Sequence, residues 1–129
     1  MKQAYSFDDV LLVPKYSNIK SRTQINISNN LDSFLRLELP VISSPMDTVT
    51  EGAMATAMAE FGGLGIIHRY NSIEIQAAMV KECAVGGSAS IAAAIGATGD
   101  YEERACALYD AGARILCIDV AHGHHSLVK

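Results

Sequence analysis

Residues 39–67 read LPVISSPMDTVTEGAMATAMAEFGGLGII, and this stretch decides the fold. Two short apolar runs, 39–42 and 64–67, stand on either side of a segment with helical periodicity, 48–61. Thr48-x-x-Glu51 has the form of a capping box, which predicts the helix start, and a glycine pair follows the last helical position. The stretch therefore predicts a strand, a helix and a second strand.

The same unit recurs along the chain. Helical patterns at 71–84 and 100–111 are followed by glycine and alternate with apolar runs at 90–95 and 115–118. Their expected capping boxes are Asn71-x-x-Glu74 and Asp100-x-x-Glu103. Strands and helices that alternate with a repeat of roughly 25 residues are typical of βα units and a parallel sheet.

The fold class expected is α/β, a (β/α)8 TIM barrel of which only about the first four βα units are present. No Gly-x-Gly-x-x-Gly follows the first strand, which disfavours a dinucleotide-binding Rossmann domain. A whole barrel needs about 250 residues, and the chain has 129. Residues 39–129 are assigned to the first half of the barrel, and residues 1–38 to an irregular N-terminal segment that packs on it. An open half-barrel leaves unpaired strand edges, so we expect the remaining half of the barrel as a partner.

Bulk composition excludes several classes of protein. The net charge is −4, which makes a nucleic-acid partner unexpected. No apolar run reaches the roughly 20 residues of a membrane span, and the N-terminus lacks a signal-peptide core. The three cysteines have no disulfide-like spacing. The sequence therefore predicts a soluble cytoplasmic protein with no membrane partner.

Polar residues gather directly after each apolar run, in segments 43–47, 68–69, 96–100 and 119–125. The carboxyl ends of parallel strands meet at one edge of a sheet, and βα folds bind ligands at that edge. We therefore expect one ligand site built from these segments.

Four segments carry a family resemblance: FDDVLLVP, ELPVISSPMDTVTE, GGLGIIHRYNSIEIQ and AAIGATGDYEERACALYDAGARILCIDVAHGHH. Together they resemble the inosine-monophosphate dehydrogenase / GMP reductase family over residues 7–125. The resemblance implies a barrel, usually a homotetramer, that binds a purine nucleotide (GMP or IMP) and a nicotinamide cofactor, with a monovalent cation held by the missing half. In that family a cysteine on a later loop attacks C2 of the purine. The dehydrogenase passes hydride to NAD, and the reductase uses NADPH and expels ammonia from GMP.

The resemblance assigns substrate binding to Ser44 and Met46. The serine would lie near the phosphate or ribose and the methionine under the base, where an adaptable thioether suits a flat purine. An alternative stays open, in which Met46 plugs the top of the barrel and the serines satisfy turn amides.

The resemblance assigns cofactor binding first to Ser21, Arg22 and Arg69. Ser21 and Arg22 lie in IKSR, which resembles a reductase pattern, and Arg69 stands where the reductases have a lysine. Two cations and a hydroxyl suit a 2′-phosphate. Alternatively, both arginines are solvated surface charges.

Three further cofactor residues, Asp119, Val120 and Ala121, match a cofactor-contacting run of the reductases. An aspartate at a strand end accepts hydrogen bonds from ribose hydroxyls in other nicotinamide sites. The resemblance also places His68 near the cofactor. The alternative is a histidine at the end of a strand that is hydrogen-bonded to the backbone.

The branch signals conflict. The connection KECAVGGSAS carries no inserted pair of regulatory CBS modules, which favours the reductases, whereas SSPMDTVTE is nearer the dehydrogenase form. The interpretation favours a GMP reductase that uses NADPH, with an IMP dehydrogenase that uses NAD as the alternative.

No catalytic residue is assigned within this chain. Its cysteines lie in predicted helices and a strand, and the family's cysteine loop is absent. His122-x-His124-His125 is too weak a pattern to assign a metal, so none is expected. We expect the chain alone to be inactive, and a non-catalytic nucleotide-binding half-barrel stays open as another class.

Overall fold

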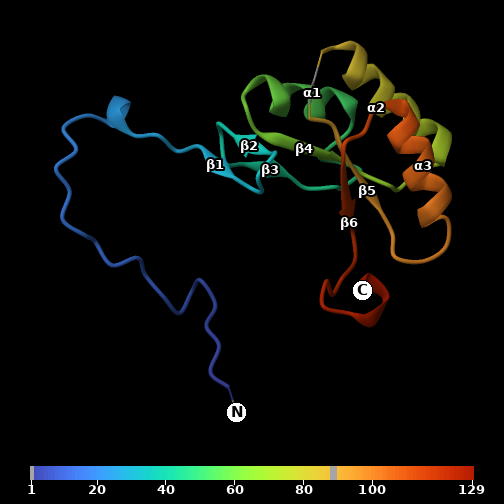
Figure 1. Ribbon diagram of the computed structural model, residues 1–129. Coiled ribbons are helices and arrows are strands. Elements are labelled where there is room, and N and C mark those ends of the chain that lie inside the picture. Colours follow the sequence, from blue (N-terminus) through green and yellow to red (C-terminus); the bar gives the residue numbers. More distant parts are fainter. Residues whose placement is uncertain (1, 88–89) are drawn as a thin grey trace.

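A parallel sheet of four strands forms the body of the chain in a computed structural model that describes residues 2–87 and 90–129 (Figure 1). The strands are neighbours in chain order, β3-β4-β5-β6, and each runs parallel to the next. Their bounds are Ile42–Ser43, Leu64–Ile67, Ala92–Ile95 and Ile115–Ile118. The connecting helices are α1 (Gly52–Glu60), α2 (Ile73–Val85) and α3 (Tyr101–Ala111).

All three helices lie on the same face of the sheet, where α2 packs between α1 and α3 (Figure 1). A doubly wound sheet would carry helices on both faces, whereas strands in chain order with helices on one face are the arrangement of a βα barrel wall. The expected α/β class with a parallel sheet is therefore confirmed. The structure is consistent with part of a barrel, and closure of that barrel stays a prediction.

Small residues bring the helices close to the sheet. Strand β5 reads AAAI and is buried throughout, and its residues Ala93 and Ile95 belong to the same core cluster as Ile67, Val80 and Leu108. In β4, a Cβ added to Gly65 would lie only 2.5 Å from the Cα of Ala55 in α1. Gly65 therefore lets α1 lie closer to β4 than a larger residue at that position would allow.

The predicted capping box at Thr48 was wrong. Helix α1 has Glu51 as its N-cap, without a side-chain capping bond, and the residues before it form a turn in which Val49 and Thr50 donate to the carbonyl of Met46. Glu51 instead directs its carboxylate toward His68. Tertiary hydrogen bonds have taken the groups that the local pattern assigned to the cap.

The other two helix starts differ from the expectation in smaller ways. Ser72, one residue after the expected Asn71, is the N-cap of α2, and its hydroxyl accepts from the Ile75 amide at 3.3 Å. Asp100 is the N-cap of α3 as expected, but its carboxylate binds Arg104 rather than backbone amides. At the other end of α3, Gly112 adopts φ +118°, the left-handed conformation that ends many helices.

The first strand begins later than the sequence predicts. Pro40 has no N–H to donate, and the register with β4 runs from Ile42, where the Leu64 amide donates to the preceding Val41 carbonyl. Strands β4 and β6 have the predicted bounds, and β5 begins at Ala92. Two residues of the connection KECAVGGSAS, 88 and 89, lie outside the described residues.

The N-terminal segment is not irregular throughout. Strands β1 (Asn29–Asn30) and β2 (Arg36–Leu37) form an antiparallel hairpin, and Leu37 is buried against the sheet. Asp32 shapes the turn, because its carboxylate accepts from two backbone amides. Residues 2–27 are exposed and extend away from the sheet (Figure 1), so packing on the barrel is seen only around β2.

Candidate functional site

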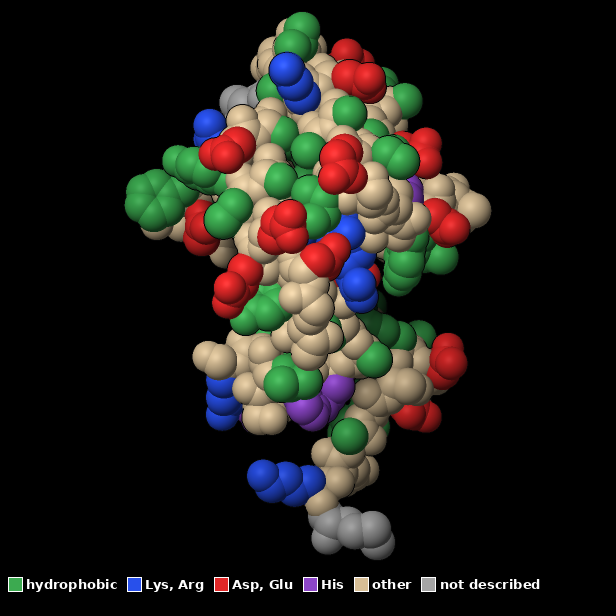
Figure 2. All heavy atoms as spheres, turned by 90° about the vertical axis from the view of Figure 1, so that its right-hand side faces the viewer, with side chains coloured by type: hydrophobic (Ala, Val, Ile, Leu, Met, Phe, Trp, Pro, Cys, Tyr) green, Lys and Arg blue, Asp and Glu red, His purple; other side chains and the backbone are tan. Residues whose placement is uncertain are grey.

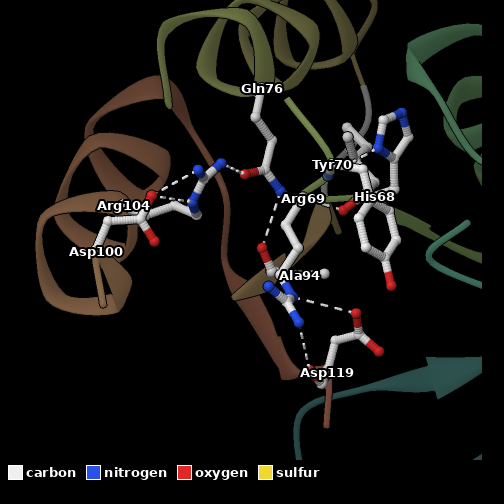
Figure 3. A network of polar contacts seen from close by, with 9 residues as sticks. His68, Arg69, Tyr70, Gln76, Ala94, Asp100, Arg104 and Asp119 are labelled. Carbon is white, nitrogen blue, oxygen red and sulfur yellow. Dashed lines mark hydrogen bonds and ion pairs between the residues drawn. The ribbon is translucent and has the colours of Figure 1, made fainter. Parts of the chain in front are cut away.

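The carboxyl ends of β4 and β6 are joined by an ion pair. Arg69, the second residue after β4, donates from Nε to the Asp119 carboxylate at 3.2 Å and from Nη2 to the Asp119 carbonyl at 3.1 Å (Figure 3). Both side chains are partly exposed. Gly96, after the intervening β5, lies beside this pair, since a Cβ there would lie 3.6 Å from Nη1 of Arg69, an ordinary contact distance. Three strand ends therefore meet around one guanidinium.

His68 is buried, with 3% of its surface exposed, beside this pair. Its Nδ1 accepts from the Tyr70 amide at 3.1 Å, so the ring proton is on Nε2, which faces Glu51 Oε1 at 3.4 Å. The His68 amide donates to the carbonyl of Thr50. The histidine thus ties the loop after β4 to the loop after β3.

The loop after β3 is held by a buried threonine. The Thr50 hydroxyl donates to the Ser44 carbonyl at 2.6 Å and lies 2.9 Å from the Ser43 hydroxyl. Ser44 is exposed, and Met46 keeps 50% of its surface exposed. Both residues that we assigned to the substrate are therefore accessible at the strand-end edge.

Val120 and Ala121 line a shallow apolar hollow after β6. Its volume is about 270 Å³, and its other walls are Ala97, His122, His125, Leu127 and Val128. Its lining begins one residue after Asp119 and joins Ala97, in the loop after β5, to the segment after β6. A flat apolar ring is the kind of group that such a surface accepts.

A family model described as the IMP dehydrogenase / GMP reductase domain matches residues 4–129. The chain belongs to the IMP dehydrogenase / GMP reductase family. The expected resemblance is therefore confirmed.

Curated relatives carry both names of this family. IMP dehydrogenase of Nitrosopumilus maritimus is 49% identical over 90 residues, which are 70% of this chain and 19% of that protein. IMP dehydrogenase of Bacillus subtilis is 56% identical over 81 residues, 63% of this chain and 16% of that protein. GMP reductase of Leishmania donovani is 44% identical over 82 residues, 64% of this chain and 17% of that protein. The chain thus spans less than a fifth of the length of these relatives.

Two residues that we assigned to the cofactor lie apart from the carboxyl ends of β4 and β6. Ser21 and Arg22 are exposed on the extended N-terminal segment, at a short 3-10 turn, Arg22–Gln24, far from β4 and β6 (Figure 1). The Ser21 hydroxyl accepts from the Thr23 amide at 3.3 Å and so serves the turn. Their role with the cofactor stays a prediction that requires this segment to fold onto the sheet.

The histidine group after β6 is arranged differently from a metal centre. His125 uses Nδ1 to accept from the Leu127 amide, and the rings of His122 and His124 meet edge to face at 6.4 Å. Within residues 2–87 and 90–129, no three His, Cys, Asp or Glu side chains come close enough together to hold a metal ion.

Acidic and basic side chains are intermixed on the surface of this family member. Figure 2 shows acidic side chains spread over the face turned to the viewer, with basic ones in small groups.

In β6, burial raises the pKa of the Cys117 thiol, and the nearby Asp119 carboxylate raises it further. No helix in the described part of the chain is both long and apolar enough to cross a bilayer.

Sequence reasoning missed three residues that shape this edge. Gln76 and Arg104 lie beneath the strand ends and contact each other, although 28 positions separate them. Glu51 was assigned to a cap and not to His68. For Gln76, the one signal in the sequence was a polar residue on the helix face where apolar residues were expected.

Proposed function

We propose that this chain supplies the first part of the (β/α)8 barrel of a GMP reductase, which reduces GMP to IMP with NADPH and releases ammonia. The observation that carries this proposal is the Arg69–Asp119 pair at the carboxyl edge of the sheet. Arg69 spends Nε and Nη2 on Asp119, while its Nη1 makes no hydrogen bond within the described residues. A guanidinium with a spare donor at a strand end suits a phosphate.

The proposed cofactor residues fit NADPH in charge and shape. Arg69 would face the 2′-phosphate, and the Asp119 carboxylate would accept from a ribose hydroxyl. Val120 and Ala121 would pack against a cofactor ring in the adjoining hollow. NADPH, when bound, supplies the hydride, and the work of these residues is to bind and orient it.

The proposed substrate residues lie at the neighbouring loop. Ser44 would donate to the nucleotide's phosphate or ribose, and the half-exposed Met46 thioether would form an apolar floor under the purine. Thr50 would keep both in place, because its hydroxyl donates to the Ser44 carbonyl and its amide donates to the Met46 carbonyl. The catalytic cysteine would come from the remaining part of the barrel, and this chain contributes binding and orientation.

An IMP dehydrogenase that uses NAD is the second candidate, and the high identity to two proteins of that name favours it. The two activities differ in cofactor, so the choice depends on the 2′-phosphate and on its proposed partner, Arg69. An arginine that faces this phosphate discriminates NADPH from NADH, whereas a solvated arginine does not.

The test combines this chain with a polypeptide that supplies the remaining strands and the cysteine loop. Oxidation of NADPH with GMP is measured beside reduction of NAD with IMP, and residues 1–129 are assayed alone as a control. We expect GMP-dependent loss of NADPH in the combined barrel and no turnover by the chain alone. Turnover of IMP with NAD only would reject the reductase assignment, and turnover by residues 1–129 alone would reject the shared barrel.

A further inference from the structure

A fully buried glutamine joins the ends of two strands to two helices. Gln76, in the first turn of α2, has no exposed surface, and its side chain points from the helix toward the Arg69 loop and Ala94 (Figure 3). The amide nitrogen donates to the carbonyl of Ile67 at 3.3 Å and to that of Ala94 at 2.9 Å. Ile67 is the last residue of β4, and Ala94 is the residue before the last one of β5. One side chain therefore fixes the carboxyl ends of two neighbouring strands.

A buried arginine completes the connection from the other side. Arg104 of α3 is 6% exposed, and its Nη1 donates to Gln76 Oε1 at 2.8 Å. Its Nη2 donates to the carbonyl of Asn71 at 3.1 Å and to the Asp100 carboxylate at 2.6 Å. The carboxylate balances the buried positive charge, and the guanidinium holds the pKa of Asp100 below its usual range.

The two acceptors on the backbone bracket the loop that carries the site residues. Ile67 precedes that loop and Asn71 follows it, so the glutamine holds one end and the arginine holds the other. Between them are His68, Arg69 and Tyr70, which include two of the residues that we assign to the cofactor. A short loop fixed at both ends has little freedom to reorient its side chains.

We propose that Gln76 and Arg104 are positioning residues, which hold the His68–Tyr70 loop so that Arg69 faces the cofactor. This inference rests on the proposed function for the cofactor, but the anchoring of the loop is independent of it. Neither side chain reaches the edge itself, since both are buried beneath it. Their effect on binding passes through the loop backbone.

Conservative variants separate positioning from folding. Gln76→Glu keeps the acceptor for Arg104 but removes both donors, so the carbonyls of Ile67 and Ala94 lose their partner. Arg104→Lys keeps a positive charge beside Asp100 but cannot reach three acceptors, because one ammonium lacks the guanidinium fork. Val80→Ala is the matched control, because Val80 is also fully buried one turn further along the same face of α2.

The first readout is hydrogen exchange of the His68 and Tyr70 amides in the chain as it exists, which needs no cofactor. Both amides are hydrogen-bonded in this loop, to the Thr50 carbonyl and to His68 Nδ1. We expect Gln76→Glu to raise their exchange rates by about tenfold or more relative to Val80→Ala. Equal rates in the two variants would overturn the anchoring.

The second readout is kinetics of the completed barrel with NADPH. We expect Gln76→Glu and Arg104→Lys to raise the KM for the cofactor roughly tenfold and to leave kcat within about twofold, as displacement of a binding group does. Val80→Ala should lower stability without changing KM. Faster exchange with an unchanged cofactor KM would overturn the positioning role. Absence of turnover in the unsubstituted barrel would instead refute the proposed function, and the exchange result would still decide the anchoring.

Discussion

Replacing Gly65 with alanine tests the close packing of α1 on β4. The added Cβ would lie 2.5 Å from the Cα and 3.0 Å from the Cβ of Ala55 in α1. Carbon atoms in contact prefer a separation of about 3.5–4.0 Å, so α1 has to move away from β4 by about 1 Å. The clash is with helix backbone, and rotation of a flexible side chain does not relieve it.

The free energy follows from two opposed effects. Overpacking of this kind costs about 1–3 kcal/mol. Alanine also restricts the unfolded chain, which returns about 0.4–1 kcal/mol because Gly65 does not adopt a positive φ. We therefore expect the free energy of unfolding to fall by about 1–2 kcal/mol, which lowers the urea midpoint by roughly 0.5–1 M.

The assay is urea denaturation followed by circular dichroism. Gly123→Ala is the matched control, since a Cβ there meets nothing within 4 Å and its φ is also not positive. That variant should unfold within about 0.5 kcal/mol of the parent chain. A midpoint for Gly65→Ala equal to that of Gly123→Ala would refute the close packing of α1 on β4.

Three further predictions concern the strand ends and the network below them. In a double-mutant cycle, Arg69→Met and Asp119→Asn should couple by about 1 kcal/mol in unfolding free energy, and additive effects would contradict their pairing. Iodoacetamide should modify exposed Cys106 well before Cys117, whose pKa burial raises, and a faster reaction of Cys117 would be contrary evidence. The pKa of Asp100 is lowered by a hydrogen bond from the arginine of α3, so its stabilisation is present at neutral pH and is lost as the pH falls below about 4. Asp100→Asn should flatten the acid limb of stability against pH, and an unchanged limb would argue against the pair.

The regular repeat could be predicted from the sequence because its signals are local. The apolar runs that became β4 and β6 are bounded by turn residues and helix stops, and their predicted bounds are the observed ones. Gly112 ended its helix as expected because the position needs a positive φ. Signals of this kind lie within a few residues of the feature that they predict.

The helix starts and the support of the site could not be read in the same way. Glu51 has the right spacing for a cap, but its carboxylate faces a histidine 17 positions away. Gln76 and Arg104 meet only when α2 and α3 are packed side by side. Hydrogen bonds between distant residues depend on packing, and periodicity carries no record of them.

The most direct test of the site is a map of amide chemical shifts on isotopically labelled protein in the completed barrel, titrated first with GMP and then with NADPH. If the strand-end edge binds both, GMP should shift the amides of Ser44 and Met46, and NADPH should shift those of Arg69, Gly96 and Asp119. Shifts confined to the opposite end of the sheet, around Gly62 and Gly63, would contradict the account.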